Sequence, residues 1–168
     1  MAASRMATGP ILILLSSLTF AGCASKEKHE EAPAAEAAPL AQGERAIKRE
    51  EWAGAPFKLD DSTEVQVSAT LASGPAIDVL VLSEADFNTW NTVVSKGQKT
   101  DASSFEPIAE LGQDGLSNAF TSQWILLPGG TYYVVFDNTS FGSTAPPASH
   151  RDDIATVDFK VTARAPEE

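Results

Sequence analysis

The sequence predicts an all-β fold, an antiparallel β-sandwich of about seven or eight strands with one short helix. Residues 64–71 and 155–163 each alternate apolar and polar side chains without interruption, as strands with one buried face do. Turn-forming residues separate such segments at a spacing of roughly 8–12 residues, which is typical of sandwiches. The sequence has no internal repeat with a period of about 20–50 residues, which excludes solenoids and propellers.

The centre of the predicted fold is residues 124–138 (WILLPGGTYYVVFDN), the most apolar and aromatic stretch outside the N-terminus. Pro128 fixes φ where a turn begins, and Gly129 and Gly130 accept the positive φ of a chain reversal. The β-branched and aromatic residues that follow suit a strand with apolar neighbours on both faces. We therefore expect a hairpin, with the rest of the chain packed around it.

Two segments and a helix precede this stretch. Residues 44–58 predict one or two short strands, and residues 76–82 predict a strand inside a sheet because both faces are apolar beyond Asp78. Ser83 and Asp86 have the spacing of a helix-capping pair. The helix that they begin is expected to cover the sandwich with one apolar face, formed by Phe87, Trp90 and Val94.

The remaining segments are less regular. Ile108 and Leu111 predict a short strand, and residues 112–115 predict a turn. Apolar side chains with a period of two then predict one face of a strand: Leu116, Phe120, Trp124 and Leu126. Residues 139–151 form a loop rich in Ser, Pro and Gly that is longer than most connections in a compact domain.

Residues 1–22 predict a secretory signal peptide. Arg5 supplies its short basic region, and residues 11–20 supply an apolar core that is too short to span a bilayer. Residues 20–23 (FAGC) resemble the lipobox of bacterial lipoproteins. The resemblance implies cleavage before Cys23, a diacylated Cys23 sulfur and an acylated amine, and so a lipid anchor on the extracytoplasmic side of the cell membrane or the outer membrane.

The chain has a single cysteine, so no internal disulfide can form. An ordinary secreted protein with an unused cysteine is the alternative to the lipoprotein. Ala24 follows Cys23 where some lipoproteins carry Asp, which by analogy favours the outer membrane in a cell that has one; the choice between the two membranes stays open.

The domain organisation follows from composition. Residues 23–43 are dominated by Ala, Glu, Lys and Pro and predict a flexible tether after the lipidated cysteine. Residues 44–163 predict the sandwich domain, and residues 164–168 a solvated tail. The formal net charge of −11 disfavours nucleic acid as a partner, because phosphates demand Lys and Arg.

No set of residues predicts catalysis. Residues 115–119 (GLSNA) approach a nucleophile elbow, but a strand pattern follows where that motif needs a helix. His150 is the single histidine of the predicted domain, which leaves neither a triad nor a zinc site. We therefore predict no enzyme, no metal and no cofactor. Calcium remains an alternative if acidic residues at strand ends converge: Asp60, Asp61, Asp137, Asp152 and Asp153.

Residues 130–138 (GTYYVVFDN) resemble the next-to-last strand of several secreted β-sandwiches, including the GOLD domains of p24-type cargo receptors and uncharacterised prokaryotic extracytoplasmic domains. The resemblance implies a jelly-roll or GOLD-like sandwich and no particular activity. We expect a non-catalytic domain that binds an envelope protein or glycan through the following loop, with four interaction residues: Asp137, Asn138, Phe141 and His150. A calcium-dependent or carbohydrate-binding module is the alternative, and a hydrolase-associated domain is the third possibility.

Overall fold

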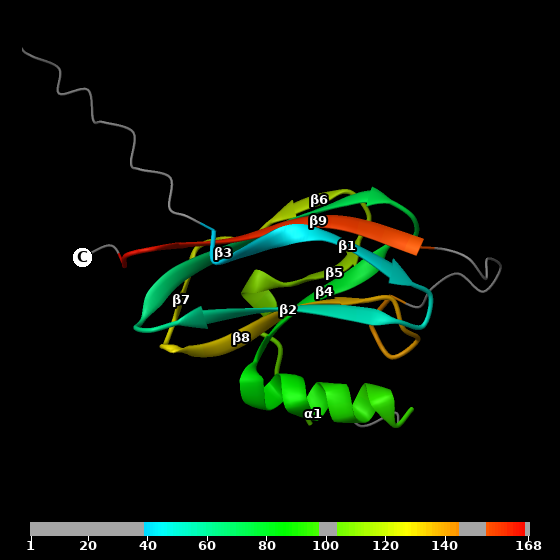
Figure 1. Ribbon diagram of the computed structural model, residues 1–168, viewed down its shortest axis with the longest axis horizontal. Helices are drawn as coiled ribbons and strands as arrows, with labels where there is room; N and C mark the ends of the chain where they lie inside the picture. Colours follow the sequence, from blue (N-terminus) through cyan, green and yellow to red (C-terminus); the bar gives the residue numbers. More distant parts are fainter. Residues whose placement is uncertain (1–38, 98–103, 145–153, 167–168) are drawn as a thin grey trace, which may run out of the picture. The chain divides into compact units, whose positions relative to one another are not determined.

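The computed structural model describes residues 39–97, 104–144 and 154–166. These residues form two antiparallel sheets packed face to face, with one helix on the outside of the second sheet (Figure 1). The fold class predicted from the sequence is therefore confirmed, with nine strands rather than seven or eight. Cys23 and His150 lie outside the described residues.

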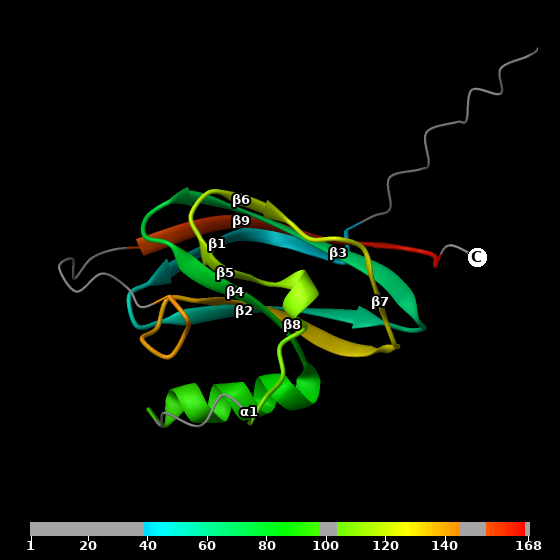
Figure 2. The same ribbon diagram turned by 180° about the vertical axis from the view of Figure 1, so that it is seen from behind.

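The first sheet has the strand order β1-β9-β3-β6, and β7 pairs with another part of β3. Its strands are β1 (Ala41–Lys48), β3 (Thr63–Ser73), β6 (Ala119–Thr121), β7 (Ile125–Leu127) and β9 (Ile154–Arg164). The second sheet has the order β2-β8-β4-β5. Its strands are β2 (Trp52–Leu59), β4 (Ile77–Ser83), β5 (Gln113–Leu116) and β8 (Gly130–Asp137). Figure 2 shows the same two layers from behind.

The core between the sheets forms from the alternating strands. Val65 and Val67 of β3 are fully buried, and so are Val157 and Val161 of β9. They belong to one apolar cluster with Val134 of β8, across the sandwich. Burying a side chain of this size contributes about 1.5–3 kcal/mol. The alternation in residues 64–71 and 155–163 thus has the predicted cause.

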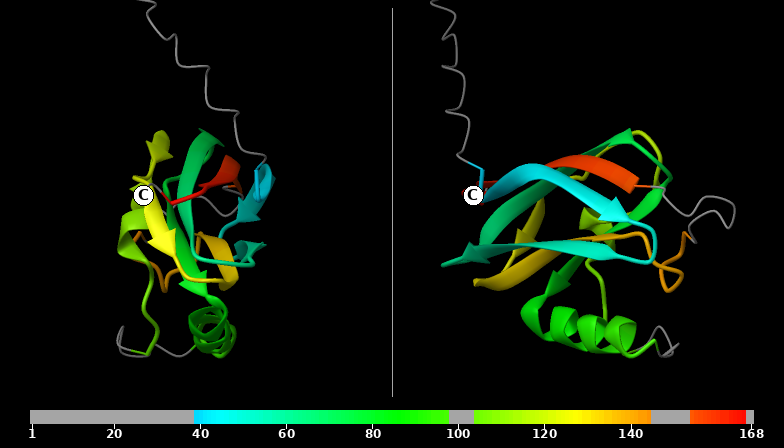
Figure 3. Two further views of the ribbon diagram at one scale, coloured as in Figure 1. Left: turned by 90° about the vertical axis from the view of Figure 1, so that its left-hand side faces the viewer. Right: turned by 45° about the vertical axis from the view of Figure 1, so that its right-hand side comes forward.

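Strand β8 is covered on both faces, as predicted. Phe136 belongs to the core between the sheets, whereas Val135 belongs to a second cluster with Leu82 and Trp90. Helix α1 (Glu84–Ser95) lies on the side of the second sheet away from the first (Figure 3). The second cluster lies between this helix and the sheet. The middle of the second sheet is therefore dry on both sides.

Helix α1 begins and packs as the sequence predicts. The Ser83 hydroxyl accepts a hydrogen bond from the Asp86 backbone N–H (3.2 Å) and donates one to the Asp86 carboxylate (2.6 Å). Phe87 stacks on Tyr133 of β8 with ring centroids 3.9 Å apart, and Trp90 meets Trp52 of β2 edge to face at 5.0 Å. These ring contacts fix the helix across β8 and β2.

The predicted hairpin at residues 124–138 is wrong. Strand β7 pairs with β3 in the first sheet, while β8 pairs with β2 and β4 in the second. The Pro128–Gly129 segment therefore crosses from one sheet to the other instead of reversing the chain within a sheet. Gly129 does not have a positive φ; it is needed for close packing, because a Cβ there would lie 2.8 Å from the Asp60 carbonyl oxygen.

Four smaller predictions also differ from the structure. The segment at Ile108 and Leu111 is a 3-10 helix, η1 (Ala109–Leu111), and residues 113–116 are strand β5 rather than a turn. Leu126 is 56% exposed, because Leu127 and not Leu126 faces the core. Strand β1 begins at Ala41, inside the segment predicted to be tether, because Ala41 pairs with Val161 of β9. Among the described residues, no helix is long and apolar enough to span a membrane.

Candidate functional site

A cleft of about 580 Å³ opens beside β4, near the end of the second sheet where β8 terminates. We call it the Asp137 cleft. Its volume lies within the range of about 300–1,000 Å³ that small-molecule sites occupy. Its walls come from β4, from α1, from residues 105–114 and from the chain after β8. The lining residues that matter below are Asp78, Trp90, Phe105, Asp114, Asp137 and Phe141.

Two buried carboxylates lie at one end of the Asp137 cleft. Asp78 of β4 and Asp137 of β8 are direct partners in the antiparallel register, and they are 0% and 1% exposed. Like charges at such paired positions destabilise a sheet. Asp78 is well satisfied, because one oxygen accepts the Gly115 N–H and the other accepts the Thr144 N–H, both at 2.8 Å. Hydrogen bonds therefore account for the burial of the Asp78 carboxylate, and the burial of Asp137 is the one to explain.

Asp137 is only half satisfied. Its Oδ1 accepts the Thr139 backbone N–H at 2.8 Å, whereas its Oδ2 is buried without a hydrogen-bond partner among the described residues. Burial raises the pKa of Asp137, and the negative charges of Asp78 and Glu50 raise it further, although the hydrogen bonds from Thr139 oppose the change. The net direction is upward, so this carboxyl holds its proton to a higher pH than an exposed aspartate does.

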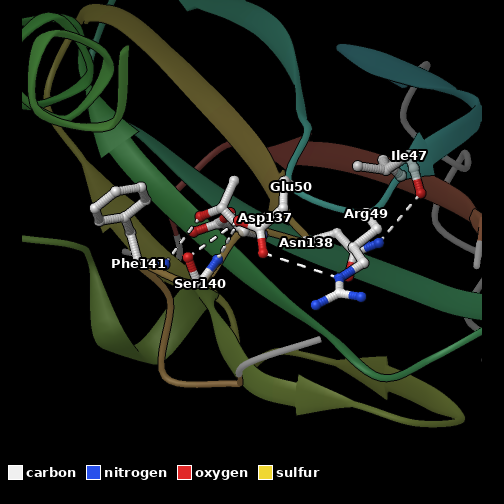
Figure 4. A network of polar contacts seen from close by, with 8 residues as sticks. Ile47, Arg49, Glu50, Asp137, Asn138, Ser140 and Phe141 are labelled. Carbon is white, nitrogen blue, oxygen red and sulfur yellow. Dashed lines mark hydrogen bonds and ion pairs between the residues drawn. The ribbon is translucent and has the colours of Figure 1, made fainter. Parts of the chain in front are cut away.

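The chain leaving β8 is fixed against the turn between β1 and β2 (Figure 4). Glu50 in that turn adopts φ +61°, and its Oε2 accepts hydrogen bonds from the Ser140 N–H (3.1 Å) and hydroxyl (3.0 Å). Asn138 donates from its backbone to the Glu51 carbonyl (3.1 Å) and from its side chain to the Ile47 carbonyl (3.3 Å). These bonds place Phe141 at the wall of the cleft.

Gly142 closes the acidic end of the cleft. A Cβ at this residue would lie 2.4 Å from Asp78 Oδ2 and 3.1 Å from Asp137 Oδ2. Both oxygens therefore pack closely against the Gly142 backbone. One of these oxygens, Asp137 Oδ2, is the atom without a hydrogen-bond partner among the described residues.

The structure brings two of the four predicted interaction residues into the cleft. Asp137 and Phe141 line it, whereas Asn138 is 0% exposed and joins the end of β8 to the β1–β2 turn. Asn138 is therefore a structural residue and not an exposed contact. His150 lies outside the described residues, and so does the predicted lipid attachment at Cys23.

Of the acidic residues considered for calcium, Asp60 does not converge with Asp137. Trp52 pairs with Asp137 and Leu59 pairs with Gly130, so Asp60 follows the opposite end of β2 from Asp137. Asp152 and Asp153 are outside the described residues. Within the described part of the chain, no group of three or more His, Cys, Asp or Glu residues is placed to hold a metal ion.

Sequence reasoning missed Asp78 as a site residue. Its signal was its position, a single charged residue inside a strand that is otherwise apolar on both faces. A buried charge must be paired, hydrogen-bonded or bound to a ligand, so Asp78 called for a partner. Ser117 of the GLSNA segment lies exposed between β5 and β6, with a strand on each side, and does not form a nucleophile elbow.

The free oxygen of Asp137 gives a testable stability effect. The Asp137→Asn variant keeps an oxygen for the Thr139 N–H and replaces the unpartnered oxygen with an amide that faces Asp78 Oδ2. We expect it to unfold at higher temperature than the wild type at neutral pH, with a gain of about 1–3 kcal/mol in the free energy of unfolding. Thermal and urea denaturation measure this gain.

The gain is expected to depend on pH. Because the folded-state pKa of Asp137 is raised, the native state of the wild type holds more protons than the unfolded state between the two pKa values. Wild-type stability therefore falls as pH rises through the folded-state pKa, and the advantage of Asp137→Asn shrinks as pH is lowered through it. An advantage that is equal at acidic and neutral pH would contradict this account. Asp61→Asn, at an exposed residue, is the control with the same charge change.

A comparison with protein families found no family model that matches this chain, and a comparison with curated proteins found no match either. The sequence and the geometry of the cleft therefore carry the functional argument.

Proposed function

We propose that this chain is a lipoprotein of the cell envelope, anchored through Cys23, whose non-catalytic β-sandwich binds a ligand in the Asp137 cleft. The observation that carries the binding role is the cleft itself, which combines an apolar wall with a buried and incompletely satisfied carboxylate. Pockets of this kind, mostly apolar with a few polar groups, are the usual form of ligand sites. The anchor rests on the lipobox-like residues 20–23.

A non-catalytic role is supported by how the two aspartates are used. Both oxygens of Asp78 already accept backbone N–H groups, and one oxygen of Asp137 does the same. A general base must be free to take a proton from its substrate. The proposed ligand is an envelope protein or glycan. The predicted tether would hold the sandwich domain at a distance from the membrane, where it can meet this ligand.

One experiment tests the anchor and the cleft together. A photo-crosslinking amino acid is placed at Phe141 in the full-length chain, and at exposed Leu126 as the control. The chain is expressed in bacterial cells with Cys23 intact or with Cys23→Ala. We expect the Cys23 form to enter the detergent phase and to form a defined adduct at position 141 but not at position 126. The Cys23→Ala form is expected in the aqueous phase.

Two separate results would contradict the proposal. A Cys23→Ala protein that still enters the detergent phase rules out the lipid anchor, with Ser25→Ala as the control for substitution near the cleavage site. Equal adducts at positions 141 and 126, or none at either, rule out the cleft as the binding site.

A further inference from the structure

We propose that the Asp137 cleft recognises a primary alkylammonium group of the kind carried by a lysine side chain of a protein ligand. The nitrogen would lie beside Asp78 and Asp137, and the alkyl chain along the aromatic wall. This inference rests on the proposed function, because it assigns the chemistry of a ligand for the same cleft.

The charge of the cleft favours a cation. Three carboxylates line the cleft, those of Asp78, Asp114 and Asp137, and no Lys or Arg among the described residues lines it. The whole chain has a formal net charge of −11. A concave surface with charges of a single sign concentrates field lines and attracts the opposite charge. The ligand group that suits this cleft is therefore a cation.

The Asp137 Oδ2 atom is an acceptor without a donor. Asp137 is 1% exposed, and its Oδ2 lacks a hydrogen-bond partner among the described residues. A buried charged acceptor without a partner is unfavourable, and a cationic donor would remove that cost. An ammonium group has three N–H donors and no acceptor. It can donate to Asp137 Oδ2, and the Asp78 carboxylate at the paired position adds attraction for the same positive charge.

The acidic end of the cleft is narrow. The Gly142 backbone packs against both carboxylates and leaves no room for a ligand atom on its side, since a Cβ there would lie 2.4 Å from Asp78 Oδ2. A compact ammonium group reaches a carboxylate in such a narrow end more readily than the wide planar fork of a guanidinium group does. The cleft should therefore prefer a lysine-type group to an arginine-type group.

The wall of the cleft suits a methylene chain. The rings of Trp90, Phe105 and Phe141 line the cleft, together with Leu80 and Ile108. The methylene chain of a lysine packs along such an apolar surface while its charged end reaches a polar group. A neutral sugar would leave the carboxylates at the acidic end uncompensated, so the cleft as a whole suits a lysine side chain better than a neutral glycan.

The test uses the mature full-length protein in detergent micelles and ligand-observed NMR titrations. The probe is Nα-acetyl-lysine N-methylamide, and its neutral counterpart is Nα-acetyl-norleucine N-methylamide, which keeps the four side-chain carbons and lacks the terminal nitrogen. The arginine analogue and glucosamine are the other two ligands. We expect the lysine probe to bind more tightly than all three, and to weaken as sodium chloride is added, because salt screens charge attraction.

Variants then assign the site. Asp137→Asn, which is expected to be more stable than the wild type, should weaken binding of the lysine probe by about tenfold or more. Phe141→Ala should weaken the lysine probe and the norleucine compound alike, because both use the wall. Asp61→Asn, which changes the net charge equally at the other end of the sandwich, should bind the lysine probe as the wild type does.

Each result bears on the inference. Wild-type binding by Asp137→Asn, or equal binding of the norleucine compound, overturns it. A preference for glucosamine overturns the inference but not the proposed binding role of the cleft. An adduct at position 141 in a protein that does not bind the lysine probe has the same consequence. A chain that shows neither the adduct nor binding of any probe loses both the inference and the proposed function.

Discussion

The Trp90→Ala variant is expected to lose about 3–5 kcal/mol of the free energy of unfolding, the usual cost of removing a buried aromatic side chain. Trp90 is 2% exposed and is the largest member of the cluster between α1 and the second sheet. It meets Trp52 edge to face, and Phe87 of its own helix lies parallel to it with centroids 6.3 Å apart. Without it, α1 keeps the stacking of Phe87 on Tyr133 but loses its most buried contact with the sheet. Urea denaturation followed by circular dichroism measures the loss.

Trp124→Ala is the matched control for this prediction. Trp124 is only half-buried, and its main charged neighbour is the Arg164 guanidinium, 4.6 Å above the ring. An exposed contact of that kind contributes about 0.5–1 kcal/mol. We therefore expect Trp124→Ala to cost much less than Trp90→Ala, and equal losses would show that the cluster under α1 does not fix the helix.

The Asp78→Ala variant is expected to lose about 3 kcal/mol or more. It removes the acceptors for the Gly115 and Thr144 N–H groups, and a hydrogen bond to a charged group contributes about 1.5–3 kcal/mol. These two bonds tie β5 and the chain after β8 to β4. The loss is partly offset, because removing the Asp78 charge also lowers the pKa of Asp137 and relieves repulsion.

The two paired aspartates thus have expected effects of opposite sign. Asp78→Ala should destabilise the protein, whereas Asp137→Asn should stabilise it, although the two residues are direct neighbours across strands. Asp78→Asn provides the intermediate case, since an amide keeps one acceptor and loses the other. A stability order other than Asp137→Asn, wild type, Asp78→Asn, Asp78→Ala would contradict the hydrogen-bonding scheme at the cleft.

The parts of the fold predicted correctly are those that local patterns determine. The alternation in residues 64–71 depends on having one buried face, which the sequence displays directly. The start of α1 depends on Ser83 and Asp86, three residues apart. In contrast, the choice of partner for β7 depends on which strand is free beside it. The Pro128–Gly129 segment predicts a change of direction, but its residues do not determine whether the next strand joins the same sheet or the other one.

The candidate site shows the same division. Phe141 was predicted to be a contact residue because a large apolar side chain in a polar loop is unusual, and it does line the cleft. Asp78 was missed because its meaning depends on Asp137, which lies far away in sequence and becomes its neighbour only when β4 and β8 pair. The burial of Asn138 was missed for a related reason, since its partner Ile47 also lies far away in sequence.

The place of β9 in the first sheet determines when the domain can be completed. Strand β9 contains the last described strand residues of the chain, yet it lies between β1 and β3 and pairs with both along most of its length. As the chain emerges from the ribosome N-terminus first, β1 has no neighbour in its sheet until β9 arrives. Pairing residues so far apart is intrinsically slow. Strands β1 and β3 can therefore be joined into one sheet only when β9 has inserted between them, so the formation of the first sheet depends on the last of its strands.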